Sequence, residues 1–73
     1  MEFRLKELRK EYGYTQSYVA NYIYVSKNSY AKYESGATEI PLDGLIKLAI
    51  LYDTSTDYIL NLTDEEFPYK RKK

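Results

Sequence analysis

Apolar residues recur along the chain at helical spacing, in short runs that polar or glycine-containing turns interrupt. The first run has intervals of four, three and four residues, which is one face of an amphipathic helix: Met1, Leu5, Leu8 and Tyr12. Gly13 follows at once and can adopt the left-handed conformation that ends a helix. The pattern therefore predicts a first helix that stops beside Gly13.

Two shorter helical patterns follow. Thr15 is a good N-cap for a helix over residues 16–23, whose apolar face is about two turns long: Val19, Ala20 and Ile23. Ser26 is a second good N-cap, for a helix over residues 27–35 that Gly36 ends. Two tyrosines mark the inner face of this helix: Tyr30 and Tyr33.

The second half of the chain predicts two more helices. Pro41 suits the start of the fourth helix, and Asp43 suits its first turn. Its apolar stripe has five members: Leu42, Leu45, Leu48, Ala49 and Tyr52. After a break at residues 53–55, Ser55 or Thr56 can cap a short fifth helix with three apolar residues: Ile59, Leu60 and Leu62. With no strand pattern and no internal repeat, the fold class is an all-α bundle of five short helices.

Composition narrows what such a bundle can do. The 73 residues suffice for one domain, which we assign to residues 1–63, with residues 64–73 expected to form an acidic, then basic, disordered tail. The chain has no cysteine and no histidine, so it lacks thiolate ligands and the commonest general base and metal ligand. We expect no metal, no cofactor and no enzymatic activity. Without a signal peptide or an apolar run of ~20 residues, the expected location is the cytoplasm, away from membranes.

The net charge is zero, which is unusual for a nucleic-acid binder, but the charges are unevenly distributed. Residues 1–36 carry six lysines and arginines against four glutamates, and residues 37–69 carry one lysine against seven carboxylates. Residues 70–73 are all basic. This asymmetry permits a DNA-binding face but does not demand one.

Two short helices separated by a turn of about three residues are the helix-turn-helix arrangement. Further motifs occur in a characteristic order: Arg4-Leu5-Lys6-Glu7-Leu8-Arg9, Thr15-Gln16, Val19-Ala20, Ile23, Val25-Ser26, Tyr33-Glu34-Ser35-Gly36, Leu45-Ile46-Lys47-Leu48-Ala49 and Ser55-Thr56-Asp57-Tyr58-Ile59-Leu60. From about residue 3 to 62 the chain resembles the phage-repressor family, also called the Cro/repressor or xenobiotic-response-element family. The resemblance implies a repressor-like helix-turn-helix bundle and a transcriptional regulator of double-stranded DNA.

The resemblance also assigns roles to residues. The outward face of the third helix holds the expected base-contacting residues: Lys27, Asn28, Ala31 and Lys32. Lysine can donate to guanine, asparagine can bond adenine with two hydrogen bonds, and an alanine methyl can touch thymine. Gln16 and Ser26 are expected to contact the DNA backbone. Arg9 and Glu34 match a family pair that bridges the first helix to the end of the third.

Three positions depart from the family pattern. Tyr24 stands in the turn where glycine is common, so the turn must either use another conformation or absorb about 1 kcal/mol of strain. Glu39 lies in a loop where relatives often place basic residues for phosphate contact. Asp53 replaces another common glycine, which is milder because aspartate tolerates the left-handed region.

Ten tyrosines are unusual in a chain of this length. Four of them suit the core: Tyr12, Tyr30, Tyr33 and Tyr52. Tyr18 and Tyr22 lie four residues apart on the expected outer face of the second helix, where they either cover the helix surface or form a partner or self-association patch.

A single short domain reads few base pairs, and two-fold symmetry doubles the site, so we expect a homodimer at least on DNA, on a palindromic operator. The fifth helix and its neighbours supply the candidate dimer contacts: Tyr58, Leu62 and Phe67. Two alternatives remain open. One is a protein-interaction module that kept the fold and lost DNA binding, which the neutral charge, Glu39 and the tyrosines favour. The other is the antitoxin of a toxin–antitoxin pair, which would combine both roles.

Overall fold

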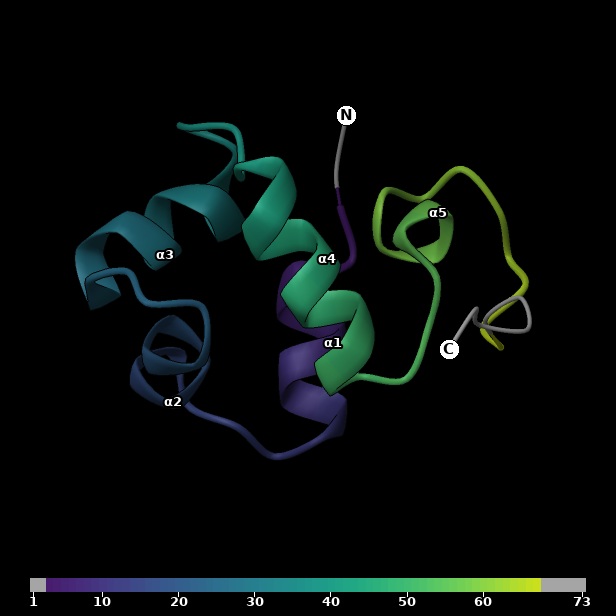
Figure 1. The fold of residues 1–73 in the computed structure, drawn as a ribbon, viewed down its shortest axis with the longest axis horizontal. Helices are drawn as coiled ribbons and strands as arrows, with labels where there is room; N and C mark the ends of the chain where they lie inside the picture. The colour runs from purple at the N-terminus through teal and green to yellow at the C-terminus, as the bar shows by residue number, and fades with distance from the viewer. Residues whose placement is uncertain (1–2, 68–73) are drawn as a thin grey trace.

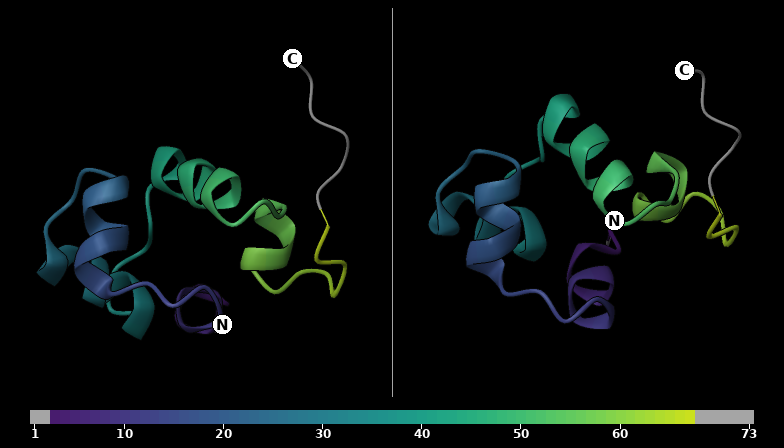
Figure 2. Two further views of the ribbon diagram at one scale, coloured as in Figure 1. Left: turned by 90° about the horizontal axis from the view of Figure 1, so that it is seen from below. Right: turned by 60° about the horizontal axis from the view of Figure 1, so that its bottom comes forward.

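The computed structural model describes residues 3–67, and within them it contains five α-helices and no strand (Figure 1). The helices are α1 (Leu5–Glu11), α2 (Gln16–Tyr22), α3 (Lys27–Ser35), α4 (Leu42–Leu51) and α5 (Thr56–Ile59). The α2–α3 pair lies on the left of Figure 1 and α5 on the right, with α1 and α4 between them. Figure 2 shows α1 and α4 as opposite layers of the bundle. The predicted all-α, five-helix fold class is confirmed.

Side-chain caps begin three of the helices. The hydroxyl groups of Thr15, Ser26 and Ser55 each accept a hydrogen bond from the backbone N–H three residues further on, at 3.0, 3.1 and 3.0 Å. Each cap satisfies one of the N–H groups that a helix start leaves without a partner, which stabilises the helix by about 1 kcal/mol. Of the two candidates for the fifth cap, the structure uses Ser55.

Glycines end the first and third helices as their positions predict. Gly36 is the C-cap residue of α3, with a φ of 80°, and Gly13 follows the end of α1 with a φ of 74°. Both angles lie in the left-handed region, which glycine enters without the steric cost that a Cβ atom brings.

The core gathers the inward faces of all five helices. Its buried residues are Leu5, Leu8, Val19, Ala20, Ile23, Tyr30, Leu45, Leu48, Ala49, Tyr52 and Ile59. Every one of them belongs to an apolar face that the helical spacing predicts. Met1, expected on the first of those faces, lies outside the described residues.

Two residues expected in the core are exposed, and a third, Tyr33, is only half-buried against it. Tyr12 is 41% exposed because it lies at the end of α1. Its ring contacts that of Tyr52, and its hydroxyl donates to the Tyr52 carbonyl oxygen at 2.8 Å. Leu42 is 70% exposed. At 100° per residue it lies at the edge of the buried stripe of α4, on the side of Ile46 and Ile50, which are also exposed.

The fifth helix is shorter than expected. It ends at Ile59, and Asn61 then takes a φ of 62°, a left-handed conformation that asparagine tolerates and that turns the chain away from the helix axis. The prediction that the helix carries Leu62 is therefore wrong, and that side chain is 62% exposed.

Contacts with the bundle continue beyond residue 63, where the domain was expected to end. Arg4 Nη2 lies 2.8 Å from Asp64 Oδ1, and the buried hydroxyl of Thr54 donates to the carbonyl oxygen of Glu66. The described part of the expected tail is thus attached to the bundle at least to Glu66. The boundary itself stays a prediction, and residues 68–73 of the tail lie outside the described residues. Between residues 3 and 67, no helix has the length and apolar character needed to cross a membrane.

Candidate nucleic-acid interface

The α2–turn–α3 unit is built around a close helix crossing. Ala20 is 1% exposed, and its small side chain lets α3 approach α2. The backbone N–H of Val25 donates to the carbonyl oxygen of Ala20 at 3.0 Å, which closes the turn before Ser26 caps α3. The two helices therefore form one helix-turn-helix unit.

The turn between α2 and α3 places Tyr24 in a strained backbone conformation. Tyr24 has a φ of 60°, so of the two outcomes open from the sequence the structure uses the left-handed one, at a cost of about 1 kcal/mol or more. The tyrosine ring is 83% exposed, and Lys47 of α4 places its Nζ atom 4.5 Å from the ring centroid. A cation–π contact at an exposed site returns about 0.5–1 kcal/mol, so it offsets part of the strain.

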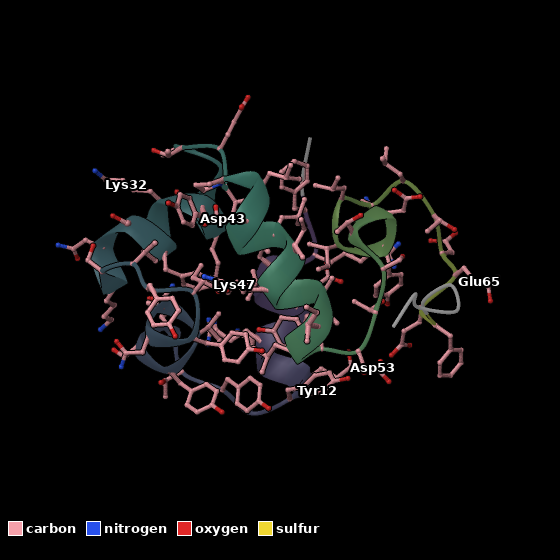
Figure 3. The ribbon with its side chains drawn as sticks, viewed as in Figure 1. Tyr12, Lys32, Asp43, Lys47, Asp53 and Glu65 are labelled. Atoms are coloured by element: carbon pink, nitrogen blue, oxygen red, sulfur yellow. The ribbon has the colours of Figure 1, made fainter. Side chains whose placement is uncertain are left out.

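The outward face of α3 is polar and basic. Lys27, Asn28 and Lys32 are exposed, and Ala31 is half-buried between them. Figure 3 shows Lys32 extending from α3 away from the rest of the bundle. The single carboxylate of the helix, that of Glu34, turns inward and is only 5% exposed. This face therefore presents two positive charges and no negative one, which suits an approach to phosphate-rich DNA.

Ser26 is exposed, but its hydroxyl is already engaged. It accepts from the backbone N–H of Ser29 at 3.1 Å and donates to the Ser29 hydroxyl at 3.0 Å. Contact with a phosphate would require that donated hydrogen, because phosphate oxygens only accept. Ser26 therefore serves first as a helix cap.

Arg9 and Glu34 meet in a two-pronged ion pair. Arg9 Nε lies 2.6 Å from Glu34 Oε2, and Arg9 Nη2 lies 3.3 Å from Glu34 Oε1. The two side chains are 13% and 5% exposed. Burial opposes ionisation of Glu34, but the hydrogen bonds that it accepts, first of all from Arg9, outweigh burial and hold its pKa below the usual value. The pair joins α1 to the last turn of α3.

A third side chain belongs to this cluster. Gln16, the first residue of α2, donates from Nε2 to Glu34 Oε1 at 3.2 Å, and Arg9 Nη1 donates to the carbonyl oxygen of Tyr14 at 3.0 Å. The sequence pattern paired Arg9 with Glu34 and treated Gln16 separately. Only the folded chain brings the three side chains together, since they come from three helices.

The candidate association residues lie on two separate surfaces. Tyr18 and Tyr22 are 50% and 37% exposed on α2, and the ring of Tyr18 stacks on Tyr14 with 4.5 Å between the centroids. On the α5 side, the ring of Tyr58 is half-buried, and the Arg4 guanidinium lies 4.0 Å from its centroid.

Beyond α5, Leu62 and Phe67 are 62% and 77% exposed. The apolar spacing missed one further exposed set, on the outer side of α4: Leu42, Ile46 and Ile50. A run of nearly continuous apolar residues conceals which members face outward, so the periodicity gave no warning of it.

Metal-binding geometry is not seen in the part of the chain that the structure describes. No group of three carboxylate side chains there is close enough to hold a metal ion. A cleft of about 460 Å³ lies between the start of α1 and the loop after α3, and none of the expected base-contacting residues lines it. Glu39 lines that cleft, in the loop where the family pattern often places a basic residue for phosphate contact.

Comparison with known proteins identifies this arrangement. The helix-turn-helix family model matches residues 5–59, which include all five helices. The chain belongs to the helix-turn-helix family. The match is of the Cro/C1 type, so the resemblance to phage repressors is confirmed.

Similar proteins carry the names of regulators. The chain is 46% identical over 70 residues to the HTH-type transcriptional regulator YobD of Bacillus subtilis (strain 168), which covers 96% of this chain and 62% of YobD. It is 42% identical over 57 residues to the HTH-type transcriptional regulator ImmR of the same organism, covering 78% of this chain and 45% of ImmR.

A solved structure shares the fold. The crystal structure of a transcriptional regulator from Listeria innocua superposes with a TM-score of 0.79 at 27% identity, over 92% of this chain and 66% of that one. Of the two Bacillus subtilis regulators, YobD and ImmR, this chain spans less than two thirds of the length.

Proposed function

We propose that this domain binds double-stranded DNA sequence-specifically and regulates transcription as a repressor, on a palindromic operator and as a homodimer. Binding, rather than catalysis, is the proposed activity. The proposal goes beyond the family assignment. The chain matches only part of the regulators named above, so family membership alone does not give it their activity.

The outward face of α3 carries the proposal. Lys27 and Asn28 occupy the first turn after the Ser26 cap, and Lys32 follows one turn later on the same side. The helix's one carboxylate is withdrawn into the ion pair with Arg9. A solvated helix face would more often mix charges of both signs, whereas a DNA-reading face needs donors free of nearby negative charge.

The expected docking follows from this geometry. α3 lies in the major groove with its N-terminal end toward the bases, where Lys27 can donate to guanine and Asn28 can bond adenine. Ala31 is half-buried, so only part of its methyl group is available to a thymine. Gln16 holds the sugar–phosphate backbone and fixes register without choosing sequence.

The homodimer extends the site to two half-sites. Leu62 and Phe67 are exposed apolar side chains beyond α5, and burying them against a second copy would remove them from water. Tyr58 lies at the edge of this surface, with its ring partly covered by Arg4.

The first experiment titrates the protein with random duplex DNA at low and moderate salt. We expect weak binding whose logarithm falls steeply with the logarithm of salt concentration. Selection from a random DNA pool should then enrich a two-fold symmetric sequence. Lys27→Ala and Lys32→Ala should weaken binding to that sequence, whereas Lys10→Ala, a matched loss of one exposed lysine on α1, should change it much less. No binding at low salt would replace this proposal by the protein-interaction module.

A second experiment tests the dimer surface. Sedimentation of the protein on the selected operator should show two copies per site, and Leu62→Asp should reduce this to one. Ile46→Asp, which adds the same charge to an exposed apolar position on α4, is the matched control. If the α4 variant separates the copies and the Leu62 variant does not, the association surface lies on α4.

A further inference from the structure

Glu34 receives hydrogen bonds from two other helices at once. Its Oε2 atom accepts from Arg9 Nε at 2.6 Å, and its Oε1 atom accepts from Arg9 Nη2 at 3.3 Å and from Gln16 Nε2 at 3.2 Å. The carboxylate therefore connects α1, the first residue of α2 and the last turn of α3. It is the meeting point between the helix expected to read bases and the residue expected to hold the DNA backbone.

The bond to Glu34 fixes how the Gln16 amide is turned. A carboxylate only accepts, so the NH₂ end of the amide must face Glu34 and the carbonyl end must face away. The NH₂ group has two hydrogens, and this bond uses one of them. The second hydrogen stays available to an acceptor such as a phosphate oxygen, and the side chain is held before any ligand arrives.

The charge of Glu34 would by itself be unfavourable beside a phosphate. The two-pronged contact with Arg9 neutralises it, and Arg9 is itself only 13% exposed. Thus the ion pair lets a carboxylate orient Gln16 without presenting a net negative charge to DNA. An uncharged acceptor at this position would make a weaker bond to the amide.

We infer that Glu34 is a positioning residue for DNA binding, which holds the Gln16 amide in the orientation that meets a phosphate and so couples the backbone contact of α2 to the placement of α3. The inference rests on the proposed function. It differs from a purely structural role, in which Glu34 would stabilise the fold through Arg9 and leave the Gln16 contact unaffected.

A double-mutant cycle on DNA affinity separates the two roles. The four proteins are the wild type, Gln16→Ala, Glu34→Gln and the double variant, each first shown to be folded by circular dichroism and thermal unfolding. Replacing Gln16 in the wild type should weaken binding about fivefold, the size of one hydrogen bond. In the Glu34→Gln background the same replacement should cost less than about twofold, because an uncharged acceptor holds the amide more weakly. Glu34→Asp, which keeps the charge but shortens the side chain, replaces Glu34→Gln if that protein does not fold.

Ser17 provides the matched control. It is the next residue of α2, it is exposed and it takes no part in the Arg9–Glu34–Gln16 cluster, so a cycle of Ser17→Ala with Glu34→Gln should be additive. In the absence of DNA, the side-chain amide resonances of Gln16 should differ between the wild type and the Glu34→Gln variant. Wild-type protein that binds no duplex DNA would overturn the proposed function. Wild-type binding with equal Gln16→Ala losses in both backgrounds would overturn only the positioning role.

Discussion

Two arginine–carboxylate ion pairs hold opposite sides of this molecule, and they differ in their exposure to water. Arg9 and Glu34 are 13% and 5% exposed, and they join α1 to α3, with Gln16 of α2 added. Arg4 and Asp64 are 16% and 99% exposed, and they join the start of α1 to the segment after α5. The buried pair organises the helices expected to bind DNA, whereas the exposed pair tethers a surface segment.

The two sides differ in surface chemistry as well. On the helix-turn-helix side, the outward face of α3 is polar and basic, and its carboxylate is neutralised internally. Beyond α3, the described chain has one lysine, Lys47, and several exposed apolar residues, among them Leu62 and Phe67. A net charge of zero thus conceals a division that we propose to be functional, with DNA on one side and a second copy on the other.

The largest expected effect comes from breaking the buried pair. Arg9→Ala leaves the Glu34 carboxylate inside the fold without its main partner, which should lower the free energy of unfolding by about 3 kcal/mol or more. Urea denaturation followed by circular dichroism measures this. Asp64→Asn is the control, and it should leave the midpoint unchanged, because surface ion pairs contribute little. Equal losses in the two variants would remove the contrast between the pairs.

Recognition of the DNA sequence should depend on residues of α3 and not on the surface beyond α5. Asn28→Ala should relax the preference at one base pair, a loss of about 1–3 kcal/mol of discrimination, while affinity for random DNA stays nearly the same. Gln16→Ala should weaken binding to all sequences by a similar factor. Competition between the selected operator and its single-base variants provides the measurement. Leu62→Ala should alter no base preference, and an unchanged preference at every position in Asn28→Ala would exclude that residue from base reading.

Three non-glycine residues of the described chain have a left-handed backbone, Tyr24, Asp53 and Asn61, and the first and last of them permit a smaller test. Tyr24→Gly should raise the free energy of unfolding by up to about 1 kcal/mol, because relief of strain exceeds loss of the exposed contact with Lys47. Asn61→Gly should lower it, since asparagine tolerates that conformation and its Oδ1 atom accepts two hydrogen bonds from Arg4. Thermal unfolding compares both with the wild type. A destabilised Tyr24→Gly protein would show that the turn needs the tyrosine.

The smallest expected effect is the loss of stability in acid that comes from protonation of Glu34. The pKa of Glu34 is lowered in the folded state, so its contribution to stability is fully present above its unfolded pKa of about 4.3 and is lost as the pH falls through the folded pKa. Unfolding measured by urea from neutral pH to about pH 3 should show this fall in the wild type. The fall should be smaller in Glu34→Gln. An identical fall in the two proteins would mean that other carboxylates govern acid stability.

Local signals along the chain determined most of the fold. Thr15, Ser26 and Gly36 mark helix ends through chemistry that acts within four residues, so their positions alone indicate where α2 and α3 begin and where α3 ends. The apolar spacing likewise indicated the core, because a residue's face on a helix depends only on its place in the chain. The family pattern also paired Arg9 with Glu34, which the structure joins.

What only the tertiary structure decided involves groups far apart in sequence or at the ends of elements. Gln16 meets Glu34 across 18 positions, and Arg4 meets Asn61 and Asp64 across 57 and 60. No local rule links such residues, since their approach depends on how the helices pack. Tyr12 shows the same limit, because helical spacing gives the direction of its side chain but not whether a neighbour extends far enough to cover it. The sequence by itself therefore determined the helices and their inward faces, and packing determined which polar side chains share a partner.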